Sequence, residues 1–165
     1  MTVIRPARPD DGDSVGRFLT GLSPTSRYQR FFTDLPKMSH ALIESLVVNT
    51  AERSVLLALA DDVVVGHAMA VRMGTLVDFG VVVAESHRRQ GIGGRLVGEL
   101  ADGVSEVQCD VLCGNYFVLR WLHRLMPGMR VERVGDTITV HGRIAGPLTY
   151  NDYVIPQSLD PVDRG

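Results

Sequence analysis

Residues 76–100 read LVDFGVVVAESHRRQGIGGRLVGEL. The stretch divides into an apolar segment (76–83), a basic and glycine-rich loop (88–94) and an amphipathic segment that ends at Leu100. This order predicts a strand, an anion-binding loop and a helix. Glycines allow a tight turn that brings several backbone N–H groups towards one point, and a helix beginning near Ile92 adds the positive end of its dipole. Such a geometry suits a phosphate or a pyrophosphate.

Two common nucleotide motifs do not match this loop. In the dinucleotide pattern G-x-G-x-x-G, counting from Gly91 places Leu96 where the third glycine belongs. A P-loop ends in Gly-Lys-Ser/Thr, whereas Gly98 is followed by Glu99. Both nucleotide-binding motifs are therefore excluded by the residues present.

The pattern Arg88-x-x-Gly91-x-Gly93, preceded by Gly80-Val-Val-Val83, closely resembles the acyl-coenzyme A signature of the GCN5-related N-acetyltransferases (GNAT). The resemblance implies that the loop amides hold the coenzyme A pyrophosphate and that the preceding strand splays to admit the pantetheine. The alternative is a glycine-rich turn used for packing alone. The cofactor-binding residues that the resemblance implies are Val81, Val82, Val83, Arg88, Arg89, Gln90, Gly91, Ile92, Gly93, Gly94 and Asn115.

Bulk properties are those of an ordinary globular domain. The chain has 165 residues, of which 45% are apolar and 22% charged, enough for one domain with a proper core. A net charge of -2 offers no electrostatic case for nucleic acid or an anionic membrane. Without a long apolar run or a secretory pattern at the N-terminus, a cytoplasmic protein is expected.

Cysteines and histidines give no sign of a metal site or a disulfide. Cys109 and Cys113 lie four residues apart in a predicted strand, about 13 Å between Cα atoms and too far for a mutual bond. We expect both thiols to be reduced. The histidines are scattered, so a metal or hydrolase site is not expected, although His87 beside the loop could touch a phosphate.

Hydrophobic periodicity predicts the order strand, helices, three antiparallel strands, helix, strand, helix, two strands. Helices are expected after Asp10 or Asp11, Ser23 and Ser39, from Ile92, and after Asn115. Strands are expected at 2–5, 54–60, 63–73, 76–83, 107–113, 129–134 and 137–144, with tight turns at 61–62 and 135–136. The strand at 107–113 is expected to lie parallel to its predecessor, because a helix separates the two.

This order indicates an α/β (α+β) fold, and it is also the order of the GNAT fold, a mixed central sheet of about seven strands flanked by helices. Residues 1–145 are the predicted N-acetyltransferase domain. The predicted tail, 146–165, has no periodicity and is either disordered or packed on the domain.

Residues 22–32, LSPTSRYQRFF, carry a second resemblance. They are similar to the N-terminal segment of a bacterial acetyltransferase subgroup that includes protein-lysine acetyltransferase domains. The helix that follows Ser23 is expected to carry Tyr28, Phe31, Phe32 and, near its end, Leu35 on one face. We expect Phe31 and Phe32 to belong to an aromatic core stripe. Arg27, Tyr28 and Arg30 either face solvent or face the substrate.

Asp78 is the candidate catalytic base, because it is an acid inside an otherwise apolar strand. The resembling lysine acetyltransferases carry a glutamate at this point, so the shorter aspartate is expected to act through a water. A carboxylate that serves solubility or a salt bridge is an equal alternative. Glu85, at the edge of the loop, is a poorer candidate.

The general acid is not apparent from the sequence. Many family members use a tyrosine in the last helix, and that position falls at or next to Leu122, which cannot donate a proton. His123 points elsewhere on the helix and Tyr116 lies at its start. Asn115 is expected to cap this helix, and the resemblance implies that it also bonds pantetheine amides.

The predicted function is transfer of an acetyl group from acetyl-coenzyme A to a primary amine, either a protein lysine or a small molecule. A non-catalytic acyl-coenzyme A sensor or interaction module is the alternative. The expected partner is the amine acceptor, with no nucleic acid and no membrane, and a homodimer is left open.

Overall fold

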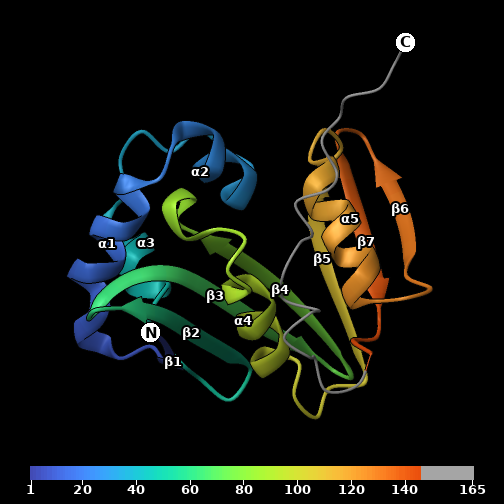
Figure 1. The fold of residues 1–165 in the computed structure, drawn as a ribbon, viewed down its shortest axis with the longest axis horizontal. Helices are drawn as coiled ribbons and strands as arrows, with labels where there is room; N and C mark the ends of the chain where they lie inside the picture. The colour runs from blue at the N-terminus through green and yellow to red at the C-terminus, as the bar shows by residue number, and fades with distance from the viewer. Residues whose placement is uncertain (146–165) are drawn as a thin grey trace.

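A computed structural model describes residues 1–145, so the predicted tail lies outside the described residues. Its sheet contains seven strands in the order β1-β2-β3-β4-β5-β7-β6 (Figure 1), which confirms the predicted fold class. The strands are β1 (Thr2–Pro6), β2 (Arg53–Ala60), β3 (Val63–Met73), β4 (Leu76–Val83), β5 (Glu106–Leu112), β6 (Arg130–Val134) and β7 (Thr137–Gly142). The helices are η1 (Pro9–Asp11), α1 (Gly12–Gly21), α2 (Pro24–Phe31), α3 (His40–Ser45), η2 (Glu85–His87), α4 (Ile92–Leu100) and α5 (Tyr116–Leu125).

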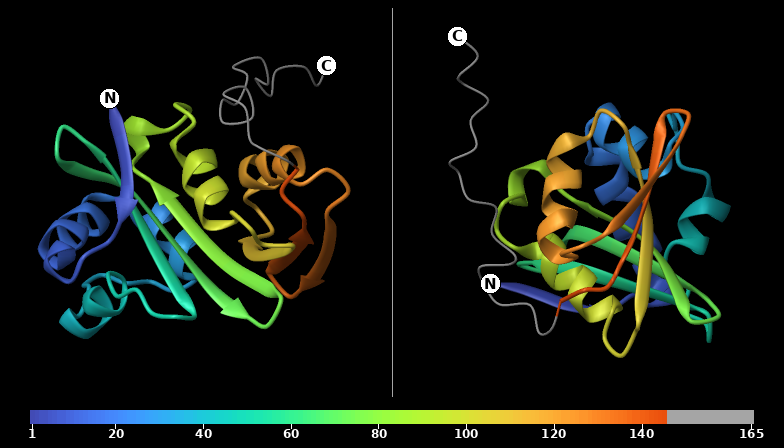
Figure 2. Two further views of the ribbon diagram at one scale, coloured as in Figure 1. Left: turned by 90° about the horizontal axis from the view of Figure 1, so that it is seen from below. Right: turned by 90° about the vertical axis from the view of Figure 1, so that its right-hand side faces the viewer.

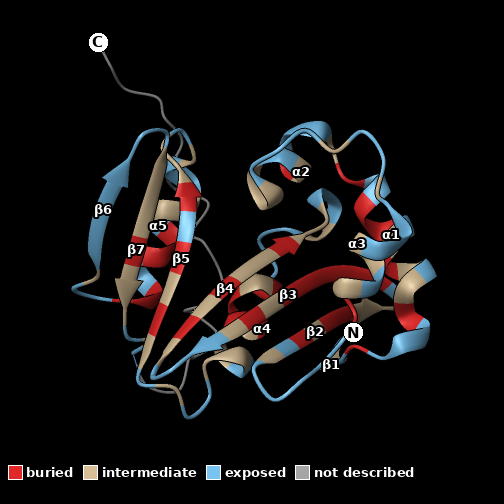
Figure 3. Ribbon diagram, turned by 180° about the vertical axis from the view of Figure 1, so that it is seen from behind, coloured by how far each residue is buried: buried red, intermediate tan, exposed pale blue. Residues whose placement is uncertain are grey.

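Helices cover both faces of the sheet (Figures 1 and 2). On one face, Leu96 and Val97 of α4 and Leu122 and Leu125 of α5 are buried against the strands. On the other face, the buried side chains of α1 pack with those that follow α3 and with Leu57 of β2. Buried residues therefore follow the middle of the sheet, whereas β6 is exposed along its whole length (Figure 3).

Every strand of the sheet is antiparallel to its neighbour except for the pair β4 and β5. The predicted parallel arrangement of these two strands is confirmed, and it follows from the helix α4 that separates them in the chain. Two tight turns occur where predicted, with φ of 48° and 62° at Asp61 and Asp62 and of 60° at Gly135. The meander from β2 to β4 thus forms as the sequence indicates.

Helix α2 is shorter than predicted, and only part of its aromatic stripe packs against the core. The helix ends at Phe31, because Phe32 takes the left-handed conformation with φ of 56°. Phe31 packs against the core, but Phe32 is 38% exposed and Tyr28 is 46% exposed. The expectation that Phe32 is a core residue is wrong, because the helix has ended before Phe32 and its side chain stays partly exposed.

Both cysteines are free, as expected. No helix within residues 1–145 is long and apolar enough to cross a membrane.

His67 of β3 is fully buried, and its Nε2 atom lies 2.8 Å from the carbonyl oxygen of Leu46. Burial, reinforced by the positive charge of Arg30, lowers the pKa of His67 from 6.5 to about 4. The unfolded chain therefore takes up a proton first as the pH falls below 6.5. The native state loses stability through this group until the pH reaches the folded pKa.

We expect His67 to remove about 3 kcal/mol from the free energy of unfolding between these two pH values. Urea denaturation at a series of pH values should show this decline in the wild type. In His67→Gln, which retains a donor for the Leu46 carbonyl, the decline should be smaller by that amount. Parallel pH profiles for the two proteins would contradict the assignment.

Candidate active site

The sheet opens between β4 and β5. The two strands pair only from Leu76 with Glu106 to Asp78 with Gln108. Beyond this point they diverge, and residues 79–83 of β4 have no partner on this side within the described part of the chain (Figure 1). The opening leaves backbone hydrogen-bonding groups unpaired in the middle of the sheet.

The alternation of the β3–β4 ladder determines which groups face the opening. The amide of Ala84 donates to the carbonyl of Val65 at 2.8 Å, so the backbone groups of Ala84 face β3. Because this direction alternates from one residue to the next along a strand, Val82 also directs its backbone groups to β3. Val81 and Val83 are out of phase and direct theirs to the opening. Their N–H groups can meet a carbonyl oxygen placed between the strands, whereas the predicted contribution of Val82 is limited to its side chain.

The glycine-rich loop stands at the mouth of this opening. Gly91 precedes α4 in the left-handed conformation, with φ of 77°, and Arg89 also has a positive φ, 61°. Among residues 1–145, the amides of 89–94 make no hydrogen bond. These amides, with the N-terminus of α4 and two adjacent arginines, suit a diphosphate.

Glu85 and Arg88 tie this loop to α2. Ser26 donates from Oγ to Oε1 of Glu85 at 2.5 Å, and the Ser23 amide donates to the same oxygen at 3.1 Å. Arg88 donates to Oγ of Ser26 at 2.8 Å and to the carbonyl of Val83 at 3.1 Å. Partial burial alone would raise the pKa of Glu85, but the hydrogen bonds from the two serines outweigh it and lower the pKa to about 2.

A cavity of about 780 Å³ follows the opening and is lined by α2, β4, the loop, β5 and α5. Gln90 is not in its lining. Asn115 lines it and also caps α5, where its Oδ1 accepts the Val118 amide at 3.4 Å. The predicted site residues in the lining are Asp78, Val81, Val82, Val83, Arg88, Arg89, Gly91, Ile92, Gly93, Gly94 and Asn115.

The sequence matches the acetyltransferase (GNAT) family over residues 21–116, which is more than half of the chain. The chain belongs to this family. The predicted family is thereby confirmed, and with it an acyltransferase that uses acetyl-coenzyme A. No curated protein matches the sequence.

Solved structures with the same fold agree with the GNAT assignment. The GNAT domain of S. lividans PAT is similar with a TM-score of 0.76 and 18% identity, covering 84% of this chain and 88% of the other. The PaiA N-acetyltransferase from Thermoplasma acidophilum, solved with coenzyme A, has a TM-score of 0.72 and 15% identity, covering 87% and 99%. Spermidine N-acetyltransferase from Vibrio cholerae, solved with coenzyme A and spermine, has a TM-score of 0.64 and 13% identity, covering 92% and 97%.

Asp78 of this GNAT protein lies in the cavity lining at the last paired position before the opening. Burial, together with the negative charge of Asp110, raises the pKa of Asp78 above its ordinary value. Asp110 lies on β5, where its Oδ1 accepts a hydrogen bond from Thr139 at 2.7 Å. The presence of Asp110 in the cavity was not predicted from the sequence. The predicted parallel pairing of β4 with β5 was the signal that could have indicated it.

The thiol of Cys109 lies in the same cavity and is not a nucleophile. Burial, with the charges of Asp78 and Asp110, raises the pKa of Cys109 to about 12. The thiol therefore keeps its proton at neutral pH.

No tyrosine of α5 faces the cavity in the described residues. Leu122, which the resemblance places at or next to the position of the family tyrosine, lines the cavity and is 1% exposed. Tyr116 is 69% exposed and lies outside the lining. Two aromatic residues of α5 that were not predicted as site residues, Phe117 and Trp121, also line the cavity.

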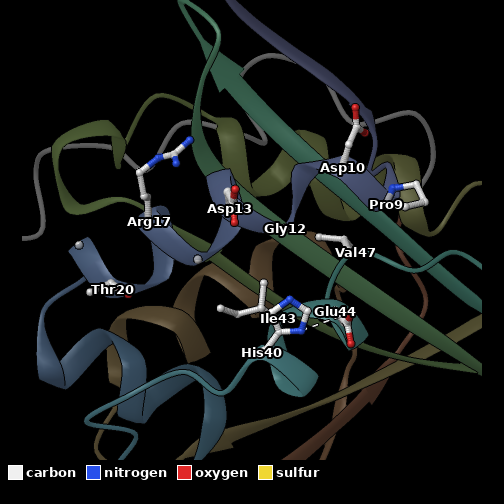
Figure 4. A pocket seen from close by; sticks show the side chains of 12 residues that line it. Pro9, Asp10, Gly12, Asp13, Arg17, Thr20, His40, Ile43, Glu44 and Val47 are labelled. Atoms are coloured by element: carbon white, nitrogen blue, oxygen red, sulfur yellow. Dashed lines mark ion pairs between the residues drawn. The ribbon is translucent and has the colours of Figure 1, made fainter.

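A second cavity, of about 710 Å³, is lined by η1, α1 and α3 (Figure 4). His40 and Glu44 of α3 approach to 3.3 Å at its edge, and Arg17 of α1 also lies there. Its lining shares no residue with the cavity beside β4. None of the predicted site residues lies in it.

We expect Gly91→Val to weaken coenzyme A binding roughly tenfold or more, because a β-branched residue resists the left-handed conformation that aims the loop amides. Isothermal titration calorimetry with coenzyme A measures the loss. Gly74→Val is the matched control, since Gly74 has φ of 67°, lies in the β3–β4 turn and has open space around it. Equal coenzyme A affinity in the two variants would contradict the loop assignment.

Proposed function

We propose that the protein transfers an acetyl group from acetyl-coenzyme A to a primary amine by direct attack, and that residues 1–145 form the catalytic domain. The acceptor is either a small molecule or a protein lysine. One observation carries this proposal: the sheet opens directly after Asp78, with unpaired amides along the opening and at its mouth.

The residues present fit coenzyme A. The free amides of 89–94 would hold the pyrophosphate, beside the positive charges of Arg88 and Arg89. The opening between β4 and β5 would accept the pantetheine, as an added strand is accepted by a sheet with unpaired groups. Asn115 lines the cavity, and its side-chain Nδ2 group is not used in capping α5.

Acetyl-coenzyme A supplies the acetyl thioester. The N–H groups of Val81 and Val83 face the position where its carbonyl oxygen would lie, and they would stabilise the negative charge that develops there. They are pre-organised because the ladder to β3 holds the strand in place. The C–N bond forms as the C–S bond breaks.

Asp78 would remove the proton that the attacking amine must lose. An alkyl ammonium with a pKa near 10.4 is not a nucleophile at neutral pH, so a base is needed. The raised pKa of Asp78 makes it a stronger base than an ordinary aspartate. Because the side chain is short, one water would relay the proton.

The leaving thiolate would take its proton from water. Leu122 cannot donate, and the exposed Tyr116 lies outside the cavity lining. Glu85 does not serve as an acid either, since its pKa near 2 keeps it ionised.

The similar structures support an amine acceptor. The Vibrio cholerae protein is described as a spermidine N-acetyltransferase and was solved with spermine. Incubation of the purified full chain with acetyl-coenzyme A and a panel of amines and lysine peptides, with free thiol as the readout, tests the proposal. Tight coenzyme A binding without thiol release on any acceptor would favour the non-catalytic module instead.

We expect Asp78→Asn to lower kcat by about 10²- to 10⁴-fold, because the base is lost. Coenzyme A affinity should be unchanged, since the loop is untouched. In the wild type, kcat should fall with decreasing pH as Asp78 takes up a proton, at a pH above the ordinary aspartate pKa. A variant with full kcat would remove Asp78 from the mechanism.

Asp110→Asn is the matched control for Asp78→Asn. It removes a carboxylate from the same cavity, together with a charge that raises the pKa of Asp78. We therefore expect this variant to retain acetyl transfer. The decrease of kcat on acidification should occur at a lower pH than in the wild type. Steady-state kinetics across the pH range compares the three proteins.

A further inference from the structure

Arg30 of α2 places a buried cation in the cavity without a partner. Its Nε and Nη2 atoms are buried and make no hydrogen bond within residues 1–145. The side chain lines the cavity beside Gly80 and Phe31, and its Cζ atom lies 5.0 Å from the centroid of the Phe31 ring. Burying a guanidinium without a hydrogen-bond or ion-pair partner costs free energy. A ligand that supplies the missing partner would offset this cost.

Gly80 makes room for this guanidinium on the face of β4. A Cβ atom added at Gly80 would lie 2.7 Å from Cζ of Arg30 and 2.8 Å from its Nη1. The guanidinium therefore lies directly on the bare backbone of the strand. A side chain at this position would push it away.

Asp78 lies two residues before Gly80 and on the same face of β4. No ion pair within 4.0 Å joins Asp78 to Arg30 in the described residues. The other titratable group that faces Arg30 is His67, which is buried and neutral. Burial lowers the pKa of Arg30 to about 10, partly offset by the charge of Asp78, so the guanidinium keeps its charge at neutral pH.

We propose that Arg30 binds a carboxylate of the acceptor, so that the preferred acceptors are small amines with a carboxylate a few atoms from the amine, as in amino acids. This inference rests on the proposed function and names the substrate class of the same site. The amine would lie towards Asp78 and the carboxylate towards Arg30.

Charge complementarity favours this acceptor class over a protein lysine. One negative and one positive side chain lie on this face of β4 and form no ion pair with each other in the described residues. This arrangement matches a molecule that carries both charges. A carboxylate can accept two parallel hydrogen bonds from a guanidinium once the side chain turns its buried Nε and Nη2 atoms towards the cavity. The side chain of a lysine within a protein carries no such anion beside its amine.

The neighbouring Arg27 shows that α2 can satisfy an arginine when the role is structural. Its guanidinium donates to the carbonyls of Thr20 and Leu22 at 3.0 and 2.8 Å. These bonds hold the end of α1 against the start of α2. Arg30, one turn later on the same helix, has no comparable partners.

The test compares acceptors in matched pairs: each of a panel of amino acids against its own carboxamide, with acetyl-coenzyme A and thiol release as the readout. We expect the wild type to prefer the free acid in kcat/KM by roughly 10- to 100-fold, mainly through KM. Arg30→Gln should remove the preference, so that kcat/KM for each free acid falls to within about twofold of that for its own carboxamide in the same variant. Its coenzyme A affinity should be unchanged.

Three further variants separate recognition from fold and from net charge. Gly80→Ala keeps the arginine but displaces its guanidinium, so it should also lose the preference. Arg17→Gln removes an exposed arginine of α1 that lies at the other cavity (Figure 4) and should keep it. Arg30→Met should melt no lower than wild type, because it removes an uncompensated buried charge.

A binding measurement decides the inference even if no amine is acetylated. Butyrate, which has no amine, is titrated into the coenzyme A complex and followed by NMR. Binding that Arg30→Gln abolishes supports the inference. Equal rates for acids and carboxamides in the wild type, a preference that survives Arg30→Gln, an Arg30-dependent preference for succinyl- over acetyl-coenzyme A, or butyrate binding equal in both proteins would overturn it.

Discussion

The organisation of this protein depends on two parallel strands that pair for three residues and then separate. Sheets normally pair every backbone group in their interior, because an unpaired N–H or C=O away from water costs free energy. Here β4 is held on one side by β3, and β5 is held on its other side by β7. Neither strand can move to close the gap without breaking its own ladder, so the unpaired groups remain available to a ligand.

The elements around the gap are tied together across the chain. The start of α2, the end of β4 and the loop before α4 meet in the hydrogen bonds among Ser26, Glu85 and Arg88. Buried side chains of α4 and α5 pack against β4 and β5. The loop amides are thus aimed by contacts that lie outside the loop itself.

The bare backbone at Gly80 has a second consequence. It allows α2 to lay a guanidinium on the strand next to the carboxylate of Asp78. Two opposite charges then lie in one cavity without forming an ion pair with each other in the described residues. The desolvation free energy of these charges would be offset when a molecule of complementary charge binds.

Local patterns in the sequence determined the strand order, the turn at Asp61 and Asp62, the glycine-rich loop and the family, because these depend on residues close together in the chain. The end of α2 was placed too late, since the left-handed Phe32 leaves no sign in hydrophobic periodicity. Only the tertiary structure decided which backbone groups of β4 stay unpaired, that Asp110 faces Asp78, and that Arg30 is buried on Gly80. These facts depend on contacts between segments distant in sequence, and a linear pattern of residue types does not contain the register and packing that create them.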